Sequence, residues 1–198
     1  MSWGKEFKQL YNSPETVLMN IQKVYSQCTE NDVLEGKGWY KSANLLSLTL
    51  SEKYSVDYIK VAGIIAALSP MKSWELNKQM AEQFLETKGR VSSHTLMQSN
   101  KARKILKYAK NICDIETCLG GLKTINFFNN IRDPDSRNYL TVDRHHIYIS
   151  TGHDIQSCTP KQYEFLKENT VIFANKIDMM PNQLQSILWV GWKRMKKE

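Results

Sequence analysis

The chain has 198 residues, of which 41% are hydrophobic and 10% aromatic, a composition that excludes a disordered segment. This length suffices for one domain, or one globule with two lobes, whose core needs neither disulfides nor a metal ion. Lys and Arg outnumber Asp and Glu by 27 to 20, giving a net charge of +7, which permits binding to a polyanion without requiring it.

The chain carries no sign of export or of membrane insertion. Its first residues lack the apolar segment of a signal peptide, and its longest apolar run, Val61 to Leu68, is too short to cross a bilayer. The four cysteines form no CxxC pair, so we expect buried thiols in a reducing compartment. We therefore expect a cytoplasmic monomer that uses no membrane, no metal and no cofactor.

Helix signals dominate the chain, and the alternation of apolar and polar residues that marks strands is nearly absent. Ser13-Pro14-Glu15 predicts a cap, a first-turn proline and a first-turn acid, which open a helix through Val24. The predicted helices that follow are Asn44 to Tyr54, Val56 to Leu68, Trp74 to Leu85 after a Ser73 cap, Lys101 to Ile112, Ile115 to Cys118, Ile125 to Ile131, one opened by Thr159-Pro160, and Pro181 to Lys197. The sequence thus predicts an all-α fold.

The helix expected over Lys101 to Ile112 has an apolar face and a face crowded with Lys and Arg. Two interpretations of the basic face stay open. It is either an ordinary solvated surface or a surface that contacts phosphates.

Two glycines, Gly120 and Gly121, stand between a short helical segment and the helix predicted from Ile125. Glycines at such a junction allow positive φ and close approach to a ligand, and the next helix offers unpaired N–H groups to an anion. A hairpin between helices can hold a DNA phosphate in this way. A Gly-Gly pair is also a common helix end and turn.

Asp143 lies in Val142-Asp143-Arg144-His145, after a predicted loop over Arg132 to Asn138. If a helix begins here, Asp143 is at or near its N-cap, where its carboxylate accepts N–H bonds, stays ionised and points outward. The alternative is an N-cap with no chemical role.

The order of these landmarks resembles that of the helix-hairpin-helix DNA glycosylases of the endonuclease III type. The sequence has Leu68-Ser69 at a helix end, a helix beginning KARKI, the hairpin LGGLKT, and VDRH twenty residues later. Together with GWYKSAN and ALSPMKSW, these motifs look like those of small phage-encoded relatives, some linked to modified pyrimidines. The resemblance covers residues 64–152, close to half the chain.

The resemblance implies one glycosylase-like domain over residues 1–198, with a cleft between two lobes. Asp143 matches the essential aspartate of the family, and Lys123 matches the lysine that forms a Schiff base in strand-cleaving members. The residues that this comparison assigns to DNA contact are Gly120, Gly121, Thr124, Met71, Lys72 and Arg144. Met71 to Trp74 matches the loop that fills the gap left by a flipped base.

The sequence departs from the family in three places. The hairpin reads LGGLKT instead of LPGVGxKT, VDRH replaces VDTH, and no cluster of four cysteines follows, so the iron-sulfur site is absent. Three functions stay open: excision of a base from DNA, group transfer onto an altered base in a phage pathway, and non-catalytic DNA binding. If a phage encodes the protein, it acts in the host cytoplasm.

Several further side chains are candidates for a base pocket. Trp39, Tyr40 and Trp74 either stack on a displaced base or belong to the core. Gln185 either reads a base edge or caps a buried amide. A metal site on the histidines is not expected, because His145 and His146, as neighbours on a helix, diverge by about 100° and do not readily face one ion. His145 is expected instead to support Asp143.

Overall fold

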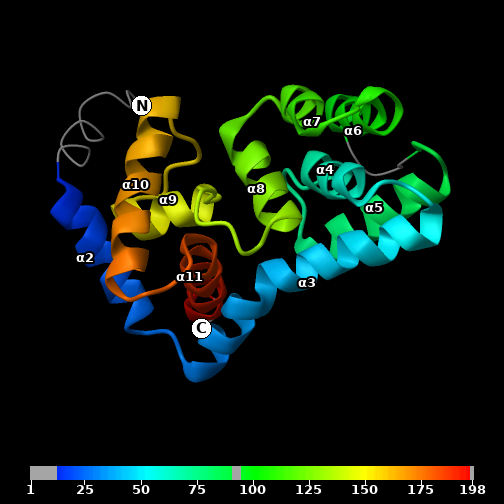
Figure 1. Cartoon of the computed structure of the whole chain (residues 1–198). Helices are drawn as coiled ribbons and strands as arrows, with labels where there is room; N and C mark the ends of the chain where they lie inside the picture. The colour runs from blue at the N-terminus through cyan, green and yellow to red at the C-terminus, as the bar shows by residue number, and fades with distance from the viewer. Residues whose placement is uncertain (1–12, 91–94, 197–198) are drawn as a thin grey trace. The chain divides into compact units, whose positions relative to one another are not determined.

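The computed structural model describes residues 13–90 and 95–196, and over these residues it contains ten helices and no strand. Figure 1 shows the helices in chain order, labelled α2 to α11. The all-α prediction is confirmed. Within the described ranges, every helix is too short or too polar to span a membrane.

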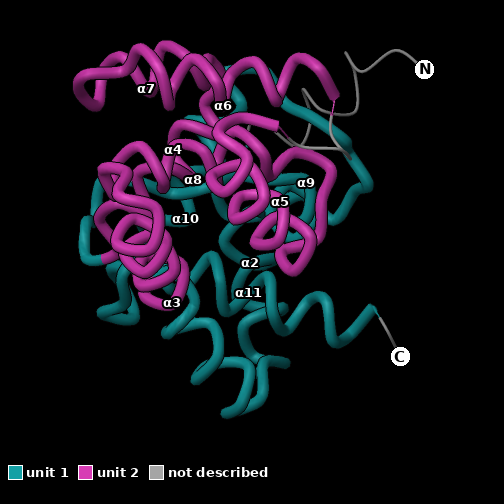
Figure 2. Tube along the Cα trace, turned by 90° about the vertical axis from the view of Figure 1, so that its right-hand side faces the viewer, with its two compact units in different colours: residues 1–40, 135–198 teal, residues 41–134 magenta. Residues whose placement is uncertain are grey.

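The chain divides into two compact units, coloured separately in Figure 2. Unit 1 comprises Met1–Tyr40 and Asp135–Glu198, and unit 2 comprises Lys41–Pro134. Helix α3 (Glu30–Tyr54) contributes its first part to unit 1 and the rest to unit 2.

Unit 2 is built around α4 (Tyr58–Leu68), in which the eight residues from Val61 to Leu68 are all buried. Four helices pack against α4: α5 (Trp74–Glu86), α6 (Leu96–Tyr108), α7 (Ile112–Leu119) and α8 (Leu122–Arg132). The longest apolar run of the sequence is therefore the central helix of this unit, apolar on all sides because it is covered on all sides.

Unit 1 contains α2 (Pro14–Tyr25), α9 (Arg144–Thr151), α10 (Pro160–Lys176) and α11 (Pro181–Met195), which pack against one another. Local signals in the sequence set where two of these helices begin. Ser13 accepts a hydrogen bond from the N–H of Thr16, and Thr159 forms a capping box with Gln162.

The predicted helix boundaries were wrong by more than one helical turn in two places, and α7 and α8 each begin three residues before the predicted start. Helix α3 begins at Glu30, well before the predicted Asn44, and α6 runs from Leu96 to Tyr108 instead of Lys101 to Ile112. Thr95, whose hydroxyl accepts a hydrogen bond from the N–H of Gln98, starts α6 five residues earlier than its basic residues indicated.

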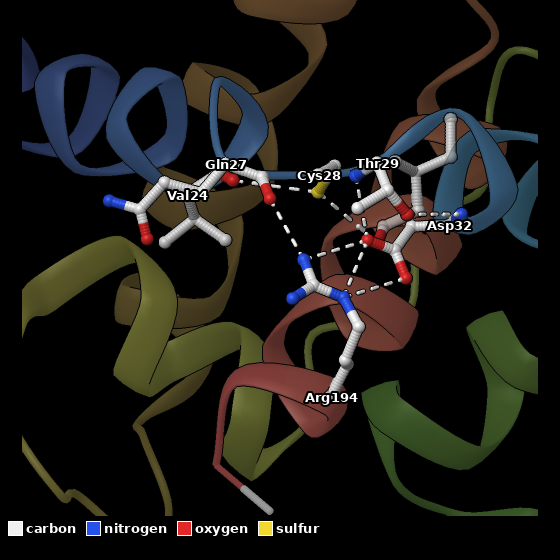
Figure 3. Close-up of polar contacts among 7 residues, drawn as sticks. Val24, Gln27, Cys28, Thr29, Asp32 and Arg194 are labelled. Atoms are coloured by element: carbon white, nitrogen blue, oxygen red, sulfur yellow. Dashed lines mark hydrogen bonds and ion pairs between the residues drawn. The ribbon is translucent and has the colours of Figure 1, made fainter. Parts of the chain in front are cut away.

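Unit 1 also contains an ion pair between a buried carboxylate in the first turn of α3 and a partly exposed arginine in the last turn of α11 (Figure 3). Asp32 is 3% exposed, and the Arg194 guanidinium lies 2.9 Å from its carboxylate while donating to the carbonyl of Gln27. Burial raises the pKa of Asp32, but hydrogen bonds from Arg194 and Thr29 outweigh it and leave the pKa below its ordinary value.

The Cys28 thiol lies beside this pair and donates to the carbonyl of Val24. Burial, with the Asp32 charge, raises the pKa of Cys28 to about 11, so the thiol is protonated at neutral pH. The expectation that all four thiols are buried was wrong, because Cys113 is exposed and Cys28, Cys118 and Cys158 are only partly buried.

Candidate functional site

Asp143 is the N-cap of α9, as predicted. Its Oδ1 accepts a 2.8 Å hydrogen bond from the N–H of His146, and its side chain is half-buried. Its Oδ2 has no hydrogen-bond partner among the described residues. The cap therefore fixes the carboxylate while leaving one oxygen available.

Two buried tyrosines hold the segment that leads to Asp143. The Tyr163 hydroxyl donates to the carbonyl of Leu140 at 2.8 Å and accepts from the N–H of Val142 at 3.1 Å. The Tyr40 hydroxyl forms a 3.1 Å hydrogen bond with the hydroxyl of Thr141. These bonds satisfy polar groups that burial would otherwise leave unpaired, and they make the approach to Asp143 rigid.

Tyr40 also ties Gln185 to this segment. Its hydroxyl donates to Oε1 of Gln185 at 2.8 Å, whereas Nε2 of Gln185 has no partner among the described residues. Trp39 packs edge-on against Tyr40 at 4.9 Å between ring centroids. Unit 1 thus brings together Trp39, Tyr40 and Gln185, three of the predicted base-pocket residues, and both Tyr40 and Gln185 are buried.

Asp143 accepts its hydrogen bond from the backbone N–H of His146, whereas the imidazole of His146 pairs with a residue of α10. The His146 ring is 1% exposed, and its Nε2 lies 2.9 Å from the Thr170 hydroxyl, which donates to the carbonyl of Leu166. Because the hydroxyl proton is already used, Nε2 carries the ring proton and donates it. Burial lowers the pKa of His146 to about 4, so the ring is neutral at physiological pH.

In unit 2, α7 and α8 are joined by Gly120 and Gly121 alone. Gly120 has φ of 72° and Gly121 is the N-cap of α8 without a side chain to cap it. The N–H groups of Leu122, Lys123 and Thr124 have no hydrogen-bond partner among the described residues. The first turn of α8 therefore exposes donors suited to an anion.

The side chains around this junction differ in their exposure and in their hydrogen bonds. Lys123 is exposed, and the Thr124 hydroxyl donates to the carbonyl of Gly121 at 3.0 Å. Lys101 of α6 donates to the carbonyl of Leu119 at 2.6 Å and so stabilises the end of α7. One of the basic residues of α6 thus has a structural partner.

The loop between α4 and α5 presents Met71 to solvent. Met71 has φ of 62°, in the left-handed region that a side chain rarely adopts, and it is 93% exposed. Lys72 is half-buried, and Trp74 packs edge-on against Phe127 at 6.5 Å between ring centroids. Trp74 belongs to unit 2 and the other aromatic candidates to unit 1.

The two units differ in charge. Unit 2 contains 14 Lys and Arg against 8 Asp and Glu, whereas unit 1 contains 13 against 12. Six of the seven net positive charges therefore belong to unit 2, which also contains the exposed helix junction and Met71. A polyanion is attracted mainly to this unit.

The remaining candidates take no part in a cluster that binds metal. Arg144 is exposed and donates to Gln156 at 3.3 Å, and His145 is half-buried. In the described ranges, no group of three or more His, Cys, Asp or Glu side chains has a geometry suited to a metal ion.

Thr141, Tyr163 and His146 were missed as parts of the site. The position of Thr141, two residues before Asp143, was a usable signal, and so was the neighbouring imidazole of His146. Nothing near Tyr163 in the sequence indicates that it reaches back to residues 140–142.

The chain belongs to a protein family described as a family of unknown function, DUF7178, whose model matches residues 5–196. No curated protein and no solved structure matches it. The arrangement of its own residues is therefore the basis for a functional conclusion.

Proposed function

We propose that this DUF7178 protein is a DNA glycosylase-like enzyme that excises a base from DNA, with Asp143 as its catalytic carboxylate. The observation that carries the proposal is the Asp143 side chain, which one hydrogen bond to α9 fixes while Oδ2 stays available. The order of motifs around Asp143, which resembles the helix-hairpin-helix glycosylases, supports the same assignment.

The chemistry requires a negative charge near the sugar. As the bond between base and sugar breaks, positive charge develops at the anomeric carbon, and a fixed carboxylate stabilises it with little reorganisation. The bonds of Tyr163 and Tyr40 to residues 140–142 keep Asp143 in place. Oδ2 faces the developing charge, or orients the attacking water, while Oδ1 remains bonded to the His146 N–H.

Unit 2 holds the DNA backbone in this proposal. The unpartnered N–H groups at the start of α8 bind a phosphate, and the excess of 14 cationic over 8 anionic side chains attracts the strand. These contacts position DNA without reading its sequence. Met71 supports the same role, because it presents an apolar side chain to water and DNA-binding proteins insert such side chains between base steps.

The base is recognised in unit 1. The Tyr40 hydroxyl fixes Oε1 of Gln185, which leaves the Nε2 donor for a carbonyl on the base edge. A flipped base must be held by such contacts, because leaving the stack costs a few kcal/mol.

Lys123 acts as a phosphate contact, and water is the nucleophile. A lysine that forms a Schiff base has to lose its proton, for which a desolvated surrounding is the usual device. Lys123 is exposed and has no such surrounding. The proposal therefore expects abasic sites without a covalent adduct.

The test is incubation of the full chain with duplexes that carry normal, damaged or phage-type bases. Alkali cleavage detects abasic sites, borohydride traps a Schiff base, and mass spectrometry detects released or altered bases. We expect alkali-sensitive sites with at least one base, loss of more than about 100-fold of the rate in Asp143→Asn, and no trapped adduct.

Asp57→Asn is the matched control. Asp57 is also an N-cap aspartate, whose Oδ1 accepts from the N–H of Ile59 at 2.7 Å. Since asparagine caps helices about as well as aspartate, both variants keep their caps and only the charge changes. Equal activity of the two variants contradicts the catalytic role of Asp143. A trapped adduct that is lost in Lys123→Ala contradicts the assignment of Lys123 as a phosphate contact. A modified base without an abasic site indicates group transfer instead of excision.

A further inference from the structure

Helix α11 carries a row of aromatic and cationic side chains that the proposed function does not use. Trp189 and Trp192 are half-buried, and Lys193 and Lys196 are exposed. On a helix, residues three and four apart lie on one face, so the four side chains are neighbours. We call these residues, with Trp39 of α3 and Tyr148 of α9, the α11 aromatic face.

The rings on this face occur in pairs, and each pair carries a lysine. Trp39 and Trp189 lie 6.0 Å apart, with the Lys193 ammonium 4.2 Å from the centre of the Trp189 ring. Tyr148 and Trp192 lie 4.8 Å apart at an angle of 40°. The Lys196 ammonium is 4.9 Å from the Trp192 ring and 5.0 Å from the Tyr148 ring.

The two lysines have no acidic partner within the part of the chain that the structure describes. No carboxylate among the described residues pairs with Lys193 or Lys196, and α11 itself contains no Asp or Glu. Arg194, between them, is paired with the buried Asp32. Lys193 and Lys196 therefore leave their charge available to an anion, with each ammonium group held beside a ring.

We infer that the α11 aromatic face binds single-stranded nucleic acid. Successive bases stack on aromatic side chains while lysines beside them contact the phosphates, and this combination is the usual basis of single-strand binding. Two ring pairs, each with one cation, match two adjacent nucleotides. The inference does not depend on the catalytic role proposed for Asp143.

Other ligands fit the face less well. A cationic ligand for an aromatic cage is repelled by the lysines that already lie on the rings. A membrane surface favours apolar side chains that protrude, but none of the strongly exposed large hydrophobic side chains of the described chain lies on α11.

The test measures binding of the full chain to a labelled oligothymidine of about 12 nucleotides. We expect the oligonucleotide to quench tryptophan fluorescence. Trp192→Leu is expected to weaken binding about tenfold through loss of one stacking position. Lys193→Gln and Lys196→Gln each reduce the slope of log affinity against log salt by about 0.7, because each removes one phosphate contact.

Lys161→Gln is the matched control, since Lys161 is an exposed lysine on α10 of the same unit. It is expected to leave affinity and salt slope unchanged. Wild-type affinity in the Lys193→Gln, Lys196→Gln double variant overturns the inference, and because both positions are exposed this variant keeps its fold. Binding of oligothymidine without quenching also overturns it. So does a double variant that no longer binds anionic phospholipid vesicles but binds oligothymidine as the wild type does.

Discussion

Gly36 and Gly38, two residues apart on α3, are predicted to respond in opposite directions to substitution by alanine. A Cβ on Gly36 would lie 2.5 Å from Cα, 2.6 Å from Cγ1 and 2.6 Å from N of Ile187 on α11. A Cβ on Gly38 would meet nothing within 4 Å. The pair therefore tests the packing of α3 on α11 within unit 1.

The magnitude follows from the atoms in contact. Two of the three Ile187 atoms belong to the backbone, so no change of rotamer relieves the overlap, and overpacking of this kind costs about 1 to 3 kcal/mol. Separation of the helices also weakens the 2.7 Å hydrogen bond from the Ser186 hydroxyl to the Gly36 carbonyl, for about 1 kcal/mol. These costs are partly offset because alanine stabilises a helix by about 1 kcal/mol relative to glycine.

We therefore expect Gly36→Ala to lower the free energy of unfolding by about 1 to 3 kcal/mol. Gly38→Ala is expected to raise it by up to about 1 kcal/mol, since only the propensity changes. The assay is urea denaturation followed by tryptophan fluorescence, which reports mainly on unit 1 because Trp39, Trp189 and Trp192 lie there. Equal midpoints for the two variants, or a stabilised Gly36→Ala protein, would refute the close approach of α3 and α11.

Three further perturbations test other buried or capping groups. Acidification from pH 7 to pH 4.5 is expected to cost about 2 to 3 kcal/mol through His146, because its pKa falls from an ordinary 6.5 when unfolded to about 4 when folded. The unfolded chain thus binds the proton more tightly, so the free energy of unfolding falls as the pH is lowered from 7 to 4.5. In denaturation experiments over the same pH range, His146→Gln should lack most of this decrease. Asp143→Ala should cost about 1 kcal/mol in thermal unfolding, and Asp143→Asn only a few tenths, because asparagine retains the cap. Arg194→Gln should cost about 3 kcal/mol in urea denaturation by leaving Asp32 buried and unpaired, whereas Arg137→Gln, which removes an exposed ion pair, should change stability by less than about 0.5 kcal/mol.

The local sequence determined where most helices begin. Ser13, Ser73, Asp143 and Thr159 each bond an N–H two or three residues ahead. Such a cap needs no distant residue, so the sequence alone indicates it. The prediction that Asp143 caps a helix succeeded for this reason.

The start of α3 was decided by tertiary packing. Residues 30–43 include Gly36 and Gly38, which lower helix propensity, and they carry no clear apolar stripe. The backbone of this segment is held instead by contacts with α11, at Gly36 and through the pair of Asp32 with Arg194. These partners are more than 140 residues away along the chain, so no local pattern reveals them.

The surroundings of the chemical groups were also decided by tertiary structure. The sequence by itself marked Asp143, the glycine pair and the aromatic residues as candidates, because residue type and spacing are local properties. Burial is not local: packing covered Tyr40 and His146 and left Cys113, Lys123 and Met71 exposed. Whether a polar group has a hydrogen-bonding position left for a ligand depends on neighbours from other helices, and only the folded chain brings these neighbours together.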